Sequence, residues 1–383
     1  MTLWDSQTFT AGARAEGVRP EVIAAALGHA SAIQGTSPYL PVIFTLYHLA
    51  KASGVSHQYL IDVASRISDP YRDFLVKKRE AAEGVAVSRR YRTICVPDPE
   101  LKKLQRWVQQ NILSKITPHA ASTAYSEGNT VRRAAERHLR ARWIVKVDIE
   151  SFFESIKEPY VAGVFERMGY PDLLSFQLGR LCTRLPTTKS RKTIFQRRRT
   201  LERGIMQSEW IGFLPQGAPT SPQLANLVMR RFDRQVTSIA HRAGLRYSRY
   251  SDDMIFSTPD AFTRDRGEAF IHELYDKLGA FGFEANRTKT RISGPGARKI
   301  VLGLLVDRGK ARLSRDFRSN IETHLHYCER EDVGPVAHAI ARRFDSVIGL
   351  HNHLLGLIAF ARQIDLDYGE GLKARIRAID WPA

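Results

Sequence analysis

Two adjacent carboxylates, Asp252 and Asp253, stand between two short runs of β-favouring residues, 246–249 and 254–257. Side chains on a strand alternate between its faces, so neighbouring aspartates can serve one site only where a hairpin bends. Carboxylates this close repel each other and raise each other's pKa unless a cation compensates. The pattern alone fits either a cation site or a solvated polar turn, since Asp and Ser are ordinary turn residues.

A third acid, Asp148, ends the apolar run 143–148. A carboxylate at the carboxyl end of a buried strand is well placed to bind a metal, because the strand fixes the backbone while the side chain reaches a cleft. The alternative is a helix N-cap, since residues 149–156 could form a helix. The residues by themselves leave both interpretations open.

The segment 212–222 is a turn crowded with Gly and Pro that runs into a predicted helix, 223–240. Pro222 suits the first turn of that helix. Gly217 and Ala218 leave room for a flat ligand to approach the backbone. A plain turn between helices does not need this composition, so the segment is predicted to contact a ligand.

The chain has 383 residues and a formal net charge of +18, spread along its length. This length allows two or three packed subdomains. The charge favours a polyanion partner, because basic surfaces bind nucleic acid by releasing counterions. A generically basic soluble protein is the alternative, and a membrane protein is disfavoured because no stretch has the apolar length of a span.

The cysteines indicate a reducing compartment without a structural zinc site, because Cys95, Cys182 and Cys328 are far apart and show no paired spacing. Residues 1–26 lack the apolar core of a signal peptide. We therefore expect a cytoplasmic protein. The histidines at 324, 326, 351 and 353 lack accompanying acidic or cysteine ligands, which favours helix packing over a metal site.

Two basic segments are candidates for contact with phosphates. Residues 71–97 predict a hairpin carrying Lys78, Arg79 and Arg92, which could fold over a triphosphate or be simply solvated. The insert 185–203 is strongly basic and poorly patterned, typical of a nucleic-acid contact loop or of a solvated loop.

Hydrophobic periodicity predicts the remaining elements. Helices are expected within 1–75 and at 98–114, 132–142, 169–185, 223–240 and 268–279, with a helical tail at 317–379, and strands are expected at 143–148, 283–290 and 300–306.

The order of these features closely resembles the palm of reverse transcriptases, and among them the bacterial retron-type enzymes. The most specific pieces are LPQGAPTSP at 214–222, YSDD at 250–253 and VKVDIESFFESI at 145–156. The resemblance runs from about residue 38 to the last residue. It implies an α+β, right-hand polymerase with fingers, a palm of antiparallel sheet with packed helices, and a helical thumb. The domains expected on this basis are an N-terminal helical extension at 1–70, fingers and palm at 71–306 and a thumb at 307–383.

The resemblance also implies phosphoryl transfer with two divalent ions, expected to be Mg²⁺ because the ligands are oxygens. Asp148, Asp252 and Asp253 would hold the ions together with the backbone carbonyl of Ile149. Asp252 is expected to bridge both ions.

Further roles follow from position in the family's motifs. Lys78, Arg79 and Arg92 resemble the finger residues that clamp the triphosphate, and Lys289 resembles the lysine that protonates pyrophosphate. The remaining matches are Phe153 as the gate against a ribose 2′-hydroxyl, Gln216 and Gly217 beside the nucleotide, and 302–305 against the primer backbone.

The sequence departs from the retron pattern at a few positions. The element 133–138 lacks the usual leading asparagine, 301–303 reads Val-Leu-Gly instead of Val-Thr-Gly, and Ser251 replaces alanine. Ser251 leaves both carboxylates in place. The other changes weaken the expectation of structured-RNA recognition and of priming from a 2′-hydroxyl.

The sequence therefore predicts an RNA-directed DNA polymerase that copies a structured non-coding RNA, as a retron component in antiphage defence. Its expected partners are that RNA as template and primer, the DNA product, deoxynucleoside triphosphates and an effector protein, with no membrane. One rival is another defence-associated or group II intron-like reverse transcriptase, although we expect no endonuclease domain after the predicted thumb, which disfavours an intron enzyme. A second rival is a catalytically silent RNA-binding scaffold.

Overall fold

The computed structural model describes residues 4–77, 91–126, 128–186 and 211–382. The chain folds into two compact units that alternate along the sequence. Unit 1 contains Met1–Ser126, Ile149–Gln235 and Lys277–Glu284, and unit 2 contains Glu127–Asp148, Val236–Asp276 and Ala285–Ala383. The domain boundaries expected after residues 70 and 306 stay predictions.

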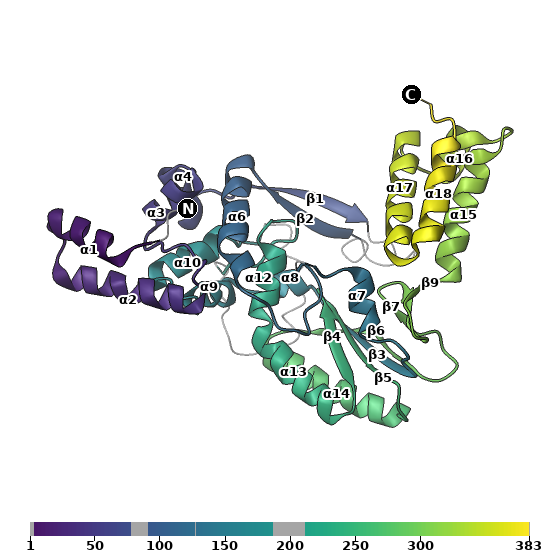
Figure 1. The fold of residues 1–383 in the computed structure, drawn as a ribbon, viewed down its shortest axis with the longest axis horizontal. Helices are drawn as coiled ribbons and strands as arrows, with labels where there is room; N and C mark the ends of the chain where they lie inside the picture. The colour runs from purple at the N-terminus through teal and green to yellow at the C-terminus, as the bar shows by residue number, and fades with distance from the viewer. Residues whose placement is uncertain (1–3, 78–90, 127, 187–210, 383) are drawn as a thin grey trace. The chain divides into compact units, whose positions relative to one another are not determined.

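Unit 1 begins with helices α1 (Ser6–Ala15), α2 (Pro20–Thr36), α3 (Leu46–Ser53) and α4 (His57–Ala64), drawn in purple in Figure 1. Local signals set their ends. The Thr45 hydroxyl caps α3 by accepting from the backbone N–H of His48, and Gly54 ends it with φ 65°. The predicted N-terminal helices are thus confirmed.

A hairpin follows, as predicted. Strand β1 (Tyr71–Lys77) pairs antiparallel with β2 (Tyr91–Pro97), with Tyr71 opposite Pro97 and Lys77 opposite Tyr91. Asp98 then caps α6 (Pro99–Asn111) by accepting from the backbone N–H of Leu101, and a 3-10 turn, η1 (Leu113–Lys115), succeeds it. Proline in the first turn of α6 fits this start.

The rest of unit 1 is mainly helical, with α8 (Phe152–Ser155), α9 (Glu158–Glu166), α10 (Asp172–Leu181) and α12 (Ser221–Val228). The predicted helix 169–185 is too long, because Arg184 leaves it to exchange backbone hydrogen bonds of 2.9 and 3.1 Å with Phe213. The predicted helix 223–240 is interrupted at Met229, where ψ is −6°, and continues as α13 (Arg230–Arg242).

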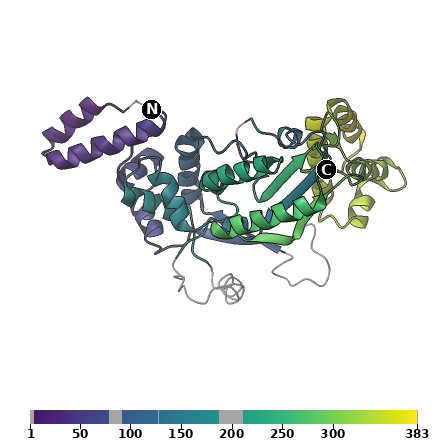
Figure 2. The same cartoon turned by 90° about the horizontal axis from the view of Figure 1, so that it is seen from below.

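Unit 2 contains a four-stranded sheet in the order β4-β5-β3-β6. Its strands are β3 (Trp143–Ile149), β4 (Arg246–Tyr250), β5 (Asp253–Thr258) and β6 (Ala285–Ser293). Helix α14 (Arg264–Ala280) lies alongside this sheet in Figure 2, and the ring of Phe270 meets that of Phe256 on β5 at 4.7 Å. Alternation therefore leaves Asp148 and Asp253 on the opposite face from Phe256.

The helix predicted at 132–142 is shorter than expected, since α7 spans only Val131–Glu136. The chain leaves helical geometry at Arg140, where φ is 61°. The backbone N–H of Arg140 donates to Arg308, and that of Arg142 donates to Thr258 at 2.9 Å. The backbone N–H groups of Arg140 and Arg142 therefore form tertiary hydrogen bonds in place of the helical hydrogen bonds of a longer helix.

The predicted strand 300–306 is wrong as a single strand. Leu302 and Gly303, with φ 49° and 84°, turn the chain into a tight hairpin of β7 (Ile300–Val301) and β8 (Leu304–Leu305), to which β9 (Arg312–Leu313) adds. The helical tail is confirmed as α15 (Arg315–Glu329), α16 (Gly334–Ala341), α17 (Val347–Ile364) and α18 (Leu366–Ala378), which form the yellow-green bundle of Figure 1.

One hydrophobic core runs through unit 2. It joins Ile144 and Ile255 of the sheet to Val301, Leu325 and Leu350 of the small strands and the C-terminal helices. The sheet face that carries the acids is thus also the face packed by the C-terminal part of the chain. Within the described residues, no helix is long and apolar enough to cross a membrane.

Candidate active site

The acids predicted to act together are brought together in unit 2. Asp148 lies directly opposite Asp253 in the antiparallel pairing of β3 with β5. Ser251 and Asp252 form the loop between β4 and β5, and Ser251 adopts φ 59°. A non-glycine residue in this left-handed region is uncommon and is tolerated where the surrounding structure demands it.

A buried arginine supports the loop, and sequence reasoning missed it. The Arg249 side chain is 0% exposed, and its Nη1 donates to the backbone carbonyl of Ser251 at 2.9 Å. A buried guanidinium needs such partners, because an unpaired buried charge is costly. Arg249 therefore holds the loop that presents Asp252.

Lys289 on β6 forms an ion pair with one of the acids. Its Nζ donates to Asp148 Oδ2 at 3.1 Å, and its side chain is 52% exposed while that of Asp148 is 9% exposed. Partial desolvation opposes the charged form of Lys289, but the attraction of Asp148, Asp252 and Asp253 outweighs it and raises the pKa of the ammonium. Lys289 is therefore a protonated group at neutral pH.

The charged forms of Asp252 and Asp253 are destabilised, so the pKa of each carboxyl is raised. Burial and the neighbouring charge of Asp148 raise the pKa of Asp252. Burial and the charges of Asp252 and Asp148 raise the pKa of Asp253 to about 6. Lys146, which shares a strand face with Asp148, offsets part of this repulsion for Asp253. The Lys146-x-Asp148 alternation could have indicated this lysine.

The donor set fits a hard divalent cation, because carboxylate oxygens are the ligands that such ions prefer. Asp252 and Asp253 are both destabilised in their charged forms by neighbouring carboxylates, and a cation would relieve this repulsion. In the parts of the chain that the structure describes, no group of three or more His, Cys, Asp or Glu side chains is already arranged to hold a metal ion. Asp148 instead bonds Lys289.

His138 is a further residue whose role sequence reasoning missed. It is 0% exposed, with Nδ1 2.7 Å from the Ser257 hydroxyl and Nε2 2.7 Å from the Ser248 hydroxyl. Burial lowers the pKa of His138 to about 3, with further contributions from Arg246, Arg137 and Lys146, so the ring is neutral. His138 thus ties β4 to β5 beneath the acidic loop. The histidine of the 133–138 element was the available signal.

Other predicted site residues lie in unit 1. The backbone carbonyl of Gln216 accepts from the N–H of Cys95 on β2 at 2.7 Å, and Gly217, with φ 113°, packs against the same strand. Arg92 is an exposed residue of the same strand, β2. The half-buried ring of Phe153 meets the ring of Phe152 edge-on at 5.4 Å.

The remaining predictions have varied outcomes. Ile149 is the last residue of β3 and is buried. Lys78 and Arg79, and most of the basic insert, lie outside the described residues. His324 is buried in the C-terminal helices, where its Nδ1 lies 2.9 Å from His338 Nε2, and the rings of Phe344 and His353 pack against it.

A β-hairpin that presents paired aspartates, with a third aspartate opposite them near the end of the neighbouring strand, is the arrangement of a nucleotidyl-transferring polymerase of the palm type. Comparison with known proteins identifies the branch. A family model described as "Reverse transcriptase (RNA-dependent DNA polymerase)" matches residues 76–300.

Several curated relatives are retron enzymes. The chain is 30% identical over 288 residues to the Retron Ec86 reverse transcriptase of Escherichia coli, covering 75% of this chain and 79% of that protein. It is 31% identical over 342 residues to the Retron Mx65 reverse transcriptase of Myxococcus xanthus, covering 88% of this chain and 72% of that protein. A solved telomerase from Candida albicans is 12% identical with a TM-score of 0.40, covering 81% of this chain and 56% of that chain, a similarity too low to add to the assignment.

The chain therefore belongs to the reverse transcriptase family, among the bacterial retron-type enzymes. It is an RNA-directed DNA polymerase, and the predicted α+β polymerase fold with fingers, palm and thumb is confirmed.

Proposed function

We propose that this reverse transcriptase copies a structured non-coding RNA into DNA with two Mg²⁺ ions, as a retron component in antiphage defence. The observation that carries the catalytic part is the cluster of Asp148, Asp252 and Asp253 beside Lys289 in unit 2. Asp148, Asp252 and Asp253, with the carbonyl of Ile149, would hold the ions. When bound, the ions supply charge neutralisation at the transferring phosphate and lower the pKa of the primer hydroxyl.

Lys289 is the proton donor of this proposal. Its raised pKa keeps it charged at neutral pH, and its half-exposed side chain leaves the ammonium accessible. When the bond to the α-phosphate breaks, pyrophosphate leaves with developing negative charge. A positioned acid that donates a proton to it accelerates this step.

Arg92, Gln216, Gly217 and Phe153 bind the incoming nucleotide in this proposal. The anchoring of the Gln216–Gly217 turn on β2 supports a common role for the turn and Arg92. Arg92 would pair with the triphosphate, since a guanidinium matches phosphate oxygens in a forked geometry. Phe153 would exclude a ribose 2′-hydroxyl. Lys78 and Arg79 are proposed for the same clamp from the resemblance alone.

The biological setting is proposed from the relatives and from charge. The relatives are named as retron enzymes, and the net charge of +18 suits an RNA partner. We place the protein in the cytoplasm with a dedicated RNA and an effector protein. A group II intron-like enzyme is the alternative. Identifying the RNA that the protein binds would distinguish it from a retron enzyme.

The test is primer extension on an RNA template with Mg²⁺, using wild type and Asp252→Asn. The wild type should extend the primer and the variant should not. Absence of product from the wild type would support a catalytically silent scaffold instead. Undiminished product from the variant would overturn the assignment of Asp252 to the metal site. Sequencing of copurified nucleic acid identifies the RNA, and branched RNA–DNA molecules there would support priming from a 2′-hydroxyl.

A further inference from the structure

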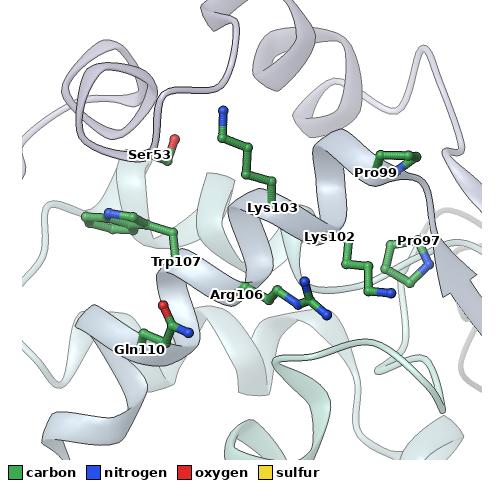
Figure 3. A pocket seen from close by; sticks show the side chains of 8 residues that line it. All are labelled: Ser53, Pro97, Pro99, Lys102, Lys103, Arg106, Trp107 and Gln110. Carbon is green, nitrogen blue, oxygen red and sulfur yellow. The ribbon is translucent and has the colours of Figure 1, made fainter.

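A pocket of about 610 Å³ opens on one side of α6 in unit 1, and it uses none of the acidic residues described above. Figure 3 shows its side chains. The ones that bear on its chemistry are Ser53, Lys102, Lys103, Arg106, Trp107 and Gln110.

The sequence of α6 explains why these side chains are available. Leu101, Leu104 and Val108 are buried and form the face that holds the helix in the unit. Lys102 and Arg106 are one helical turn apart, and Lys103, Trp107 and Gln110 form a second row, since residues four or seven apart share a face. The pocket is therefore lined by side chains that the helix does not need for its own packing.

The pocket is strongly cationic. Its lining contains no Asp or Glu. Lys103 Nζ donates to the backbone carbonyl of Gly54 at 2.6 Å, which fixes this cation at the rim. Among the residues that the structure describes, neither Lys102 nor Arg106 forms an ion pair with a carboxylate. An anion is the ligand that this charge favours.

Trp107 indicates which class of anion the pocket could bind. Its ring is half-buried and lies near Ser53 on one side of α6 in Figure 3, with Gln110 one turn along the helix, while Lys102 and Arg106 extend toward the other side. Indole rings stack on nucleobases, and base–aromatic stacking with basic contacts to the backbone is how proteins hold single strands. The volume is within the range of pockets that hold small ligands, roughly 300–1,000 Å³.

We propose that this pocket binds a single-stranded RNA segment, with one unstacked base on Trp107 and phosphates of the adjoining strand on Lys102 and Arg106. A duplex is not the occupant, because its bases are already stacked. The inference depends on the proposed function in one respect, because it takes RNA as the partner of the protein. It adds a binding site that the polymerase chemistry does not require.

The probe is a fluorescent dodecauridylate, titrated without nucleotides at several salt concentrations. Trp107→Ala should weaken binding on the order of tenfold, and Trp107→Phe should restore much of it, because a ring is retained. The double variant Lys102→Gln/Arg106→Gln should reduce the salt slope by about 1.4, since each phosphate that is no longer neutralised lowers the slope by about 0.7.

The matched control is Arg14→Gln/Arg19→Gln, which removes the same charge from exposed positions of unit 1 away from the pocket. It should leave the salt slope close to that of the wild type. Primer extension at saturating primer–template should be unchanged in every pocket variant. A wild type that binds the oligonucleotide but extends no primer would overturn the proposed function of the acidic cluster while leaving the pocket inference intact.

Wild-type affinity in Trp107→Ala together with a wild-type salt slope in Lys102→Gln/Arg106→Gln would overturn the inference. A reduced slope without any effect of Trp107→Ala would also overturn it, because the pocket would then bind phosphate without holding a base. Thermal melting of each variant verifies the fold. If Trp107→Ala is unstable, Trp107→Leu replaces it as the variant without a ring, and Lys102→Gln/Arg106→Gln still tests the phosphate contacts.

Discussion

Lys289 Nζ lies 3.1 Å from Asp148 Oδ2, joining residues 141 positions apart in the sequence. Their strands, β6 and β3, are neighbours in the sheet. The hydrogen bond places a protonated ammonium against the buried acid of the site. The same lysine therefore offsets repulsion among the carboxylates and supplies the acid proposed to protonate pyrophosphate.

Lys289→Ala should reduce the rate of nucleotide addition about a hundredfold, the scale of general-acid catalysis. Lys289→Arg should keep the positive charge beside Asp148 but donate its proton poorly, so it should fold normally and still be slow. Single-turnover incorporation at saturating nucleotide measures this. Full activity in both variants would remove Lys289 from the reaction.

Asp252→Asn should reduce primer extension by at least about two orders of magnitude. Its melting temperature should be unchanged or raised, because the raised pKa of Asp252 shows that the folded protein disfavours its charge. Measuring both primer extension and thermal unfolding distinguishes a loss of catalysis from a folding defect. A lower melting temperature would contradict the electrostatic account.

His138 makes stability depend on pH. Its pKa of about 3 in the folded protein is below the ordinary value of 6.5, so the unfolded chain binds the proton more readily. The stabilisation is complete above pH 6.5 and is lost as pH falls toward 3, amounting to about 3 kcal/mol of unfolding free energy by pH 4. Urea unfolding at pH 7.5 and 5 measures it.

The matched variant is His138→Gln, which cannot titrate in this range. It should be less stable than the wild type at pH 7.5, because glutamine cannot bond both serine hydroxyls as the ring does, but its stability should fall less between pH 7.5 and 5. It should also lower kcat more than it raises KM, since His138 positions the strands of the acidic hairpin. Equal pH dependence in the two proteins would contradict the buried neutral ring.

Gly217→Ala should destabilise the protein by about 2 kcal/mol. Its φ of 113° is unfavourable for alanine, and the new Cβ would lie 2.8 Å from Ile94 Cγ2 and 2.9 Å from the Cys95 carbonyl. Those atoms belong to β2, so the turn would move off the strand. Thermal unfolding measures the destabilisation, and Gly296→Ala is a control with positive φ but open space around it.

Phe153→Ala should admit ribonucleotides, because the proposed ring that clashes with a 2′-hydroxyl is removed. Competition between a deoxynucleotide and the matching ribonucleotide, compared as ratios of kcat/KM, measures the change. Phe152→Leu is the neighbouring control, since Phe152 is buried and its replacement should affect stability more than sugar choice. Unchanged discrimination in Phe153→Ala would place the gate elsewhere.

Much of the site could be predicted from local sequence. Adjacent aspartates between β-favouring runs indicate a hairpin, and an acid at the end of an apolar strand indicates a cleft, because alternation and turn preference are properties of a few neighbouring residues. The same local rules were wrong where distant groups compete for the backbone. The helix expected at 132–142 ends early because Arg140 and Arg142 donate to Arg308 and Thr258 instead.

The sequence by itself thus determined the family, and it indicated the carboxylates and the lysine that we propose for the chemistry. Only the tertiary structure decided which of these groups touch. It set Lys289 against Asp148, buried Arg249 behind the carbonyl of Ser251 and placed His138 between Ser248 and Ser257. Such interactions depend on strand order and burial, and these are settled by packing of the whole unit, which no local pattern encodes.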